Sequence, residues 1–251
     1  MRFAVRRAAV AVALIMSAFA CDNPDQTSLD DVIARHVEAL GGAPALDAIK
    51  SVRIRATIVE PTFEVTGDYR ASVDGMMRVD IFAGAERVFS EGVDADGPWQ
   101  QNGAGAPMTG MSAEGEAALR HGIEFNLFGL HRFAERGHSL ALEGEKMIGD
   151  VRYHVVKAKL ADGFETFFYI NAETALIERR RDRRALHPDV DAEERPIETV
   201  YGDFAVDCGV LGARASKQFD LVSGAVVQTT QVIERACNLP ADQLSIARDI
   251  P

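Results

Sequence analysis

Apolar and polar residues alternate along residues 51–59, a pattern typical of a β-strand with one face in water. The apolar positions are Val52, Ile54, Ala56 and Ile58, and arginine and threonine occupy the positions between them. The alternation returns, between turn residues, in residues 63–71, 77–83 and 86–93. The pattern therefore predicts four neighbouring strands of an antiparallel meander.

Apolar residues at helical spacing predict three helices. Ser28 is the expected N-cap of the first, with Asp31 three residues on in the spacing of a capping box, and the apolar stripe of this helix ends at Gly41. A short helix is expected over residues 44–50. A longer one is expected over residues 112–136, where one side carries Leu119, Ile123, Leu127, Leu130 and Phe133. This last helix is the best candidate to cover the sheet.

The second half of the chain carries further strand patterns, most of them joined by short turns. Seven segments show the pattern: residues 138–149, 151–160, 163–171, 175–182, 196–206, 213–222 and 225–236. A glycine-rich connection is expected over residues 96–107, and a long coil over residues 182–194. The whole pattern predicts an α+β fold, with about eleven antiparallel strands in one sheet and helices packed against it.

The N-terminus has the layout of a secretory signal. Three arginines precede an apolar run over residues 8–20, which is shorter than the roughly 20 apolar residues that a membrane-spanning helix needs. Ala18 and Ala20 supply small residues before Cys21, an arrangement that resembles a bacterial lipoprotein signal. The alternative is ordinary cleavage, which leaves an exported protein with a free Cys21.

This layout predicts the organisation and the compartment of the protein. The expected parts are a signal peptide over residues 1–20, a tether over residues 21–27 and a single domain over residues 28–251. Lipid attachment at Cys21 would hold the domain on a membrane of the cell envelope, facing the periplasm. The sequence leaves open whether that membrane is the inner or the outer one.

The three cysteines fit this organisation. If Cys21 carries lipid, Cys208 and Cys237 remain as a pair. A hairpin that turns near Ser223 would place Cys237 opposite residue 209, within a step of Cys208. A disulfide is therefore expected, and it would close a loop of about 30 residues and stabilise the fold by roughly 3 to 4 kcal/mol. The alternative is two buried free thiols.

The charge of the chain disfavours nucleic acid as a partner. It has 27 basic and 38 acidic residues, and removal of residues 1–20 leaves 24 basic against 38 acidic, a net charge of −14. Nucleic acid and anionic lipid both prefer basic surfaces. A membrane contact would thus depend on acyl chains at Cys21. With 47% hydrophobic residues the chain can bury a full core.

Four segments carry a resemblance to a known superfamily. They read ARHVEALGGAPALDAIKSVRIRATI, FFYINAETALIERRR, IETVYGDFAVDCGVLGARASKQFD and LPADQLSIARDIP. Their order is a helix, a Gly-Gly pair, a short helix, a first strand and late strands that turn back. This order is similar to that of the LolA/LolB-like superfamily of bacterial lipoprotein carriers and outer-membrane lipoprotein receptors, over residues 28–251.

The resemblance implies a strongly curved antiparallel half-barrel, closed on its concave side by helices, with an apolar cavity that takes acyl chains. The sequence pattern agrees, because the expected helices have too few wide apolar stripes to seal eleven strands. The candidate cavity residues are Val52, Ile54, Ile58, Phe63, Val65, Tyr69, Met77, Val79, Ile81, Leu127 and Phe133. The alternative is that these residues fill a solid core.

The sequence carries none of the sharp catalytic motifs: no G-x-S-x-G, H-E-x-x-H, P-loop or C-x-x-C. His121 and Glu124 lie three apart on a predicted helix, but a zinc site needs a third ligand. His187, Asp189 and Asp191 alternate in a predicted loop and could hold a hard cation, or simply be solvated. We expect no catalytic residue, no cofactor and no metal.

One strongly basic run, ERRRDRR, occupies residues 178–184 of this acidic chain. It is expected at the end of a strand and the start of a loop. There it could meet an acidic partner or a phosphate head group through Arg180 and Arg181. Alternatively, it forms a charged hairpin that protects a sheet edge and is neutralised by the acids of residues 189–194.

Three functions remain from these observations. The first is a non-catalytic envelope lipoprotein that binds an apolar ligand, such as the acyl chains of a lipid or lipoprotein, in the cavity of the half-barrel. The second is an interaction or scaffold protein of the same fold whose core is filled. The third is an envelope hydrolase with a histidine and acid pair, which would need shifted titratable groups in a cleft. Ligand and protein partner stay unnamed.

Overall fold

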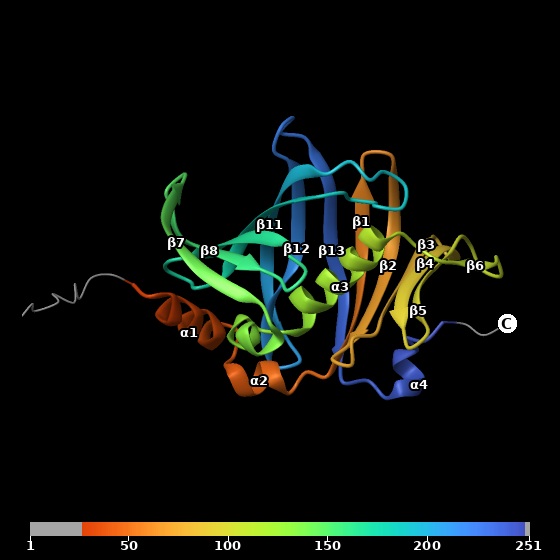
Figure 1. Ribbon diagram of the computed structural model, residues 1–251, viewed down its shortest axis with the longest axis horizontal. Helices are drawn as coiled ribbons and strands as arrows, with labels where there is room; N and C mark the ends of the chain where they lie inside the picture. The colour runs from red at the N-terminus through yellow and green to blue at the C-terminus, as the bar shows by residue number, and fades with distance from the viewer. Residues whose placement is uncertain (1–26, 249–251) are drawn as a thin grey trace, which may run out of the picture.

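The computed structural model describes residues 27–248, which form a 13-stranded antiparallel sheet and a few helices. The strand order is β6-β5-β4-β3-β2-β1-β13-β12-β11-β10-β9-β8-β7. The sheet is open, because β6 and β7 are separate edges, and it curves around helix α3 (Figure 1). The predicted signal peptide, Cys21 and residues 22–26 of the tether lie outside the described residues.

The helices and strands follow the expected order along the chain. The first part holds α1 (Leu29–Ala39), α2 (Ala43–Asp47), β1 (Ser51–Glu60), β2 (Phe63–Ser72), β3 (Met77–Ala83), β4 (Glu86–Asp94), β5 (Gly97–Gln101), β6 (Met108–Thr109) and α3 (Ala113–Leu127). The second holds η1 (Leu130–Arg132), η2 (Ala134–Arg136), β7 (Ser139–Ile148), β8 (Val151–Lys159), β9 (Glu165–Asn171), β10 (Ile177–Arg184), β11 (Arg195–Asp207), β12 (Val210–Asp220), β13 (Val226–Cys237) and α4 (Ala241–Leu244). Among residues 27–248, no helix is long and apolar enough to span a bilayer.

The sheet has two strands more than the expected eleven: β5 lies in the predicted glycine-rich connection, and β6 directly follows that connection. β5 pairs with β4 although it begins Gly97-Pro98, and the two-residue β6 pairs with β5. Trp99 explains why β5 is a strand. Its side chain is buried on the outer face of the sheet, and the guanidinium of Arg78 lies 5.5 Å from the centre of its ring. One large buried side chain thus fixes a strand whose glycine and proline are poor strand formers.

The alternation in β1 separates the two faces of the sheet as expected. Val52 lies opposite Ala71 of β2 and Cys237 of β13, and it packs in one cluster with side chains of α3. We call this face, which carries α3, the inner face, and the opposite one the outer face. Arg53 and Arg55 lie on the outer face, because successive strand residues point to opposite sides.

Helix α1 covers the other end of the inner face. Ser28 and Asp31 form the predicted capping box, in which the Asp31 amide donates to the Ser28 hydroxyl at 3.2 Å. The helix buries Val32 in a cluster that includes Phe133 of the turn after η1 and Val156 of β8. This cluster is separate from the one beneath α3.

Helix α3 is shorter than the helix expected over residues 112–136. It ends at Leu127, because Phe128 is extended, and two 3-10 turns follow in place of continued helix. Gly129 allows the break, since a side chain there would sit 2.6 Å from Nδ1 of His131. The apolar spacing that suggested one helix therefore serves two elements, which reach the two clusters.

The C-terminal segment covers part of the outer face. Arg70 donates to the carbonyl of Ser245 and Arg78 to that of Ala247, at 3.2 and 2.9 Å. Both arginines belong to a buried ion network with Asp68 and Asp80. The outer face of β2–β4 is therefore covered by backbone and paired charges, and Leu244 and Ile246 of the covering segment are buried as well.

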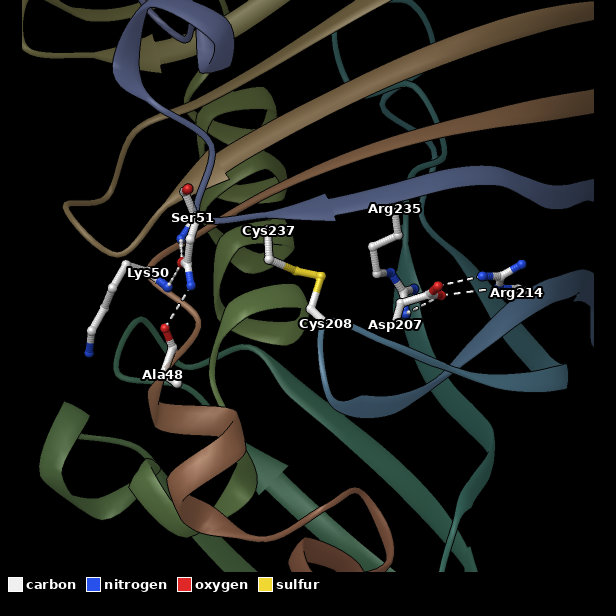
Figure 2. The surroundings of a disulfide bond; sticks show 9 residues. Ala48, Lys50, Ser51, Asp207, Cys208, Arg214, Arg235 and Cys237 are labelled. Carbon is white, nitrogen blue, oxygen red and sulfur yellow. Dashed lines mark hydrogen bonds and ion pairs between the residues drawn. A yellow bond between two sulfur atoms is a disulfide. The ribbon is translucent and has the colours of Figure 1, made fainter.

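The predicted disulfide between Cys208 and Cys237 is formed (Figure 2). β12 and β13 pair in the expected register, with Ser216 opposite Thr230. The bond joins the β11–β12 turn to the end of β13, where Asn238 accepts from the amide of Lys50 at 2.7 Å. It thereby ties the middle of the sheet to the start of β1.

Candidate functional site

Seven of the predicted cavity residues pack into the two apolar clusters. Those beneath α3 are Val52, Ile54, Tyr69, Met77, Val79 and Leu127, and Phe133 belongs to the cluster beneath α1. Val52, Met77 and Phe133 are nearly inaccessible to solvent. The hydroxyl of Tyr69 also donates to the Gly122 carbonyl of α3 at 3.2 Å. These side chains contact one another and the helices.

The other four predicted cavity residues lie beyond these clusters, on the inner face of the β1–β2 and β3–β4 hairpins. With Phe89 they form what we call the hairpin patch: Ile58, Phe63, Val65, Ile81 and Phe89. Ile58 lies opposite Val65, and Ile81 opposite Phe89. Gly67 leaves room between the two isoleucines, since a Cβ there would sit 2.9 Å from Cδ1 of Ile58. All five are partly exposed, and Phe63 is the most open of them at 42%.

The loop between β10 and β11, residues 185–194, crosses the inner face beside this patch, and we call it the strap. His187 Nε2 lies 3.0 Å from Oε1 of Glu60, at the end of β1. Asp189 Oδ1 accepts from the amide of Ser112, the N-cap of α3, at 2.7 Å. The strap therefore spans from the β1–β2 hairpin to the start of α3 (Figure 1).

An acidic side chain lies on the apolar inner face below the strap. Glu91 of β4 is opposite Val79 of β3 and follows Phe89 on the same face. Burial raises the pKa of Glu91 to about 7, and the nearby Asp189 carboxylate contributes to the rise. Glu91 is therefore largely uncharged below neutral pH.

The middle of the inner face is polar. Arg180, Asp182 and Arg184 alternate along β10, and we call them the arginine cluster. The Asp182 carboxylate is fully buried, pairs with both arginines and accepts from the Thr166 hydroxyl at 3.2 Å. Burial and the neighbouring Arg180 lower the pKa of Arg184. One carboxylate thus faces two guanidinium groups.

A chain of hydrogen bonds connects this cluster with the strap. Arg184 donates to Gln218 of β12 at 2.8 Å, and Gln218 donates to Gln228 of β13 at 2.6 Å. Gln228 donates in turn to Glu60 at 2.9 Å, the residue that contacts His187. Polar side chains therefore cross the inner face along one line of neighbouring strands.

The basic run does not lie at a sheet edge, and its expected neutralisation by loop acids is wrong. β10 pairs with β9 on one side and β11 on the other. On the outer face Arg179 and Arg181 both pair with Glu198 of β11, at 3.1 and 2.7 Å. The partners are cross-strand neighbours, because the strand continues through the run to Arg184.

The candidate metal ligands named in the sequence contact separate partners. His121 Nε2 lies 2.6 Å from Oδ2 of Asp162, whereas Glu124 pairs with Arg136 and His138. In the strap, His187 contacts Glu60, Asp189 accepts from the Ser112 amide and Asp191 pairs with Arg195. Among residues 27–248, no group of three acidic, histidine or cysteine side chains is arranged to hold a metal.

Two surface pockets are lined mainly by polar residues. One, of about 350 Å³, lies on the inner face beside α1 and is lined by Thr27, Arg35, Leu142, Gly144, Glu145, Arg152, His154 and Ala172. The other, of about 300 Å³, lies on the outer face and is lined by Arg53, Arg55, Thr66, Asp68, Arg70, Phe82, Gly84 and Ala85. None of the predicted cavity residues lines either pocket.

The sequence matches no protein family model and no curated protein. The fold, in contrast, matches solved structures. A LolA superfamily protein from Nitrosomonas europaea aligns with a TM-score of 0.56 at 12% identity, over 89% of this chain and 99% of its own. The chain has a LolA-like fold.

Two further structures support this LolA-like fold. A DUF1329 family protein from Desulfovibrio piger aligns with a TM-score of 0.57 at 11% identity, over 87% of this chain and 98% of its own. A domain from Vibrio parahaemolyticus assigned to outer membrane lipoprotein sorting aligns with a TM-score of 0.52 at 9% identity, over 85% of this chain and 94% of its own. The resemblance read from the sequence is thus confirmed for the fold.

Within this LolA-like fold, two features that shape the inner face beyond the clusters were not predicted from the sequence. The strap was expected as a plain coil, and Glu91 was passed over as a polar position. Glu91 carried a signal, because it falls on the apolar side of the alternation in residues 86–93, between Phe89 and Val93. The anchors of the strap carried none, since Glu60 and Ser112 are far from it in sequence.

Proposed function

We propose that this protein is a non-catalytic protein of the bacterial cell envelope that binds an apolar chain, such as the acyl chain of a lipid or lipoprotein. The observation that carries the proposal is the hairpin patch. It offers five apolar side chains, partly open to solvent, on the inner face of a LolA-like fold. A domain assigned to outer membrane lipoprotein sorting shares this fold.

Burial of apolar area is the proposed binding mechanism. Each 100 Å² of apolar surface removed from water contributes about 2.5 kcal/mol. The strap and the N-terminus of α3 border the patch, so a bound chain would lie between the sheet and these two elements. We propose that the helix-covered face of the half-barrel thus serves as the binding side, with no metal and no covalent step.

The proposal includes a lipid anchor at Cys21. The small residues before Cys21 and the pairing of the other two cysteines support it. Labelled palmitate fed to bacteria that express the full chain should enter the protein, and Cys21→Ser should abolish the label. A wild-type chain that takes up no palmitate would contradict the anchor.

Bound lipid tests the ligand. The full chain with Cys21→Ser, exported to the periplasm and purified without detergent, should release a defined lipid or fatty acid when extracted with organic solvent. Mass spectrometry should find it in near-stoichiometric amount. A lipid-free protein that also fails to bind a fluorescent fatty acid would contradict the proposal.

The second candidate function is a scaffold or interaction protein of the same fold with a filled core. Two observations favour it: seven predicted cavity residues pack in the two clusters, and both surface pockets are polar. The extraction experiment separates the two functions, because a scaffold would yield no lipid.

A further inference from the structure

The arginine cluster carries more positive than negative charge inside the fold. Within the described range, residues 27–248, Asp182 is the one carboxylate that pairs with Arg180 and Arg184. The guanidinium groups are largely covered, with 16% and 20% of the two side chains exposed. A buried charge without a full partner costs free energy, so an excess cation here calls for a role beyond stability.

Arg180 is the member with free hydrogen-bonding capacity. Its Nε lies 3.0 Å from Asp182 Oδ2, yet it makes no hydrogen bond of good geometry with any residue in 27–248. Its guanidinium lies 5.1 Å from the ring centre of Phe125 on α3, and Tyr201 of β11 and Arg184 are further polar neighbours. Among residues 27–248, the Arg180 guanidinium is thus held by one ion pair and one aromatic ring, which leaves it capacity for a further acceptor.

A row of partly exposed side chains leads from this cation to the hairpin patch. Tyr201 lies opposite Ser216, Ser216 opposite Thr230, and Thr230 opposite Ile58, which is opposite Val65. The row crosses from β11 to β2, about 19 Å at the usual strand spacing. Its middle members, Ser216 and Thr230, are small hydroxyl residues that project little from the sheet.

We propose that the inner face binds an anionic amphiphile, whose carboxylate or phosphate head pairs with Arg180 and whose apolar chain crosses the strands to the hairpin patch. This inference rests on the proposed function and adds the class of head group. A guanidinium group suits an anionic head group, because the planar donors of the guanidinium match carboxylate and phosphate oxygens. The rest of the chain, with its net acidic charge, offers such a head group little attraction.

The positive charge of Arg180 at one end of this row and the hairpin patch at the other end would orient the ligand. A head group at Arg180 would complete the pairing that Asp182 alone leaves unfinished. The strap would then lie over the tail, because it is anchored beside the patch at Glu60 and at Ser112.

The test compares probes of equal chain length that differ in the head group. The full chain with Cys21→Ser is titrated with a fluorescent fatty acid, with the corresponding fatty alcohol and with a lysophosphatidic acid competitor. We expect the acid to bind at least about tenfold more tightly than the alcohol, a preference that falls at high salt. The competitor shows whether a phosphate head is preferred over a carboxylate.

Arg180→Gln should reduce the affinity for the acid to that for the alcohol and leave the alcohol unchanged. Arg183→Gln is the matched control, since Arg183 lies on the outer face of the same strand and should change neither affinity. Arg180→Lys should keep part of the preference. Circular dichroism melting checks that each variant is folded.

The outcomes separate this inference from the proposed function. Equal binding of acid and alcohol by the wild-type protein would overturn the head-group site and leave apolar binding standing. That comparison needs no variant, so it holds even if Arg180→Gln does not fold. Binding of none of the probes would overturn both.

Discussion

The inner face of the sheet has a closed part and an open part that share one sequence pattern. Beneath α3, Val52 and Met77 are buried by the helix. A few residues further along the same strands, Ile58 and Ile81 have the same polarity and direction but lie outside the cluster, beside the strap. The comparison teaches that alternation fixes the face of a residue, whereas the covering element decides whether it stabilises the fold or stays available to a ligand.

The largest expected effect concerns the closed part. Phe133→Ala should lower the free energy of unfolding by about 3 to 5 kcal/mol, because it removes a buried ring from the cluster beneath α1. Urea unfolding measures the loss. The fraction of the variant that stays folded should bind fatty acid with unchanged affinity. A large loss of affinity would contradict the division of the inner face into a closed part and an open part.

The disulfide should stabilise both parts equally. Reduction, or Cys208→Ser with Cys237→Ser, opens a loop that spans a sequence separation of 29 residues. We expect a loss of roughly 3 to 4 kcal/mol, chiefly because the unfolded chain gains freedom. Urea midpoints with and without reductant measure it. Alkylation of the unreduced, unfolded protein is the control, and modification of both cysteines there would show that no bond exists.

Glu91 should link stability to pH at the border between the parts. Its pKa is about 7 in the folded protein and 4.5 ordinarily, so the folded chain holds an extra proton between these values. Stability should therefore fall as the pH rises from about 4.5 to 7, and then level off.

Glu91→Gln should remove this dependence and raise the free energy of unfolding at pH 8 by about 1 to 3 kcal/mol. Urea unfolding of both proteins at pH 5, 6, 7 and 8 provides the measurement. Parallel curves across the series would show that Glu91 is not desolvated.

The smallest effect on stability is expected in the open part. Phe63→Ser should change the free energy of unfolding by less than about 1 kcal/mol, because the ring is 42% exposed. The fatty-acid affinity of this variant should nevertheless drop by about tenfold, which corresponds to the binding free energy that one partly buried ring contributes. Val222→Ser is the matched control, an exposed apolar residue outside the patch. Equal affinity of the two variants would remove the patch from the binding site.

The fold was largely predictable because its signals are local. Alternation identified eleven strands, and the capping box at Ser28 and the β12–β13 register appeared as expected. β5 was missed because its glycine and proline hide a strand that is fixed by the burial of Trp99. The break after Leu127 was missed because the apolar spacing continues across it.

The candidate site was less predictable because its parts meet only in the folded chain. The basic run revealed its charge, but its two-sided pairing within the sheet depends on β9 and β11. Successive residues of β10 point to opposite faces of the sheet, so Asp182 shares the inner face with both Arg180 and Arg184. The excess positive charge of the arginine cluster follows from this arrangement. The anchors of the strap join residues more than 70 positions apart.

Photo-crosslinking tests the central claim most directly. A fatty acid with a diazirine at the end of its chain is bound to the full chain with Cys21→Ser, irradiated, and the adducts are located by peptide mass spectrometry. The account predicts saturable labelling on residues 58–65 and 81–89, which unlabelled fatty acid suppresses. Labelling confined to the outer face, or labelling that excess fatty acid does not suppress, would contradict it.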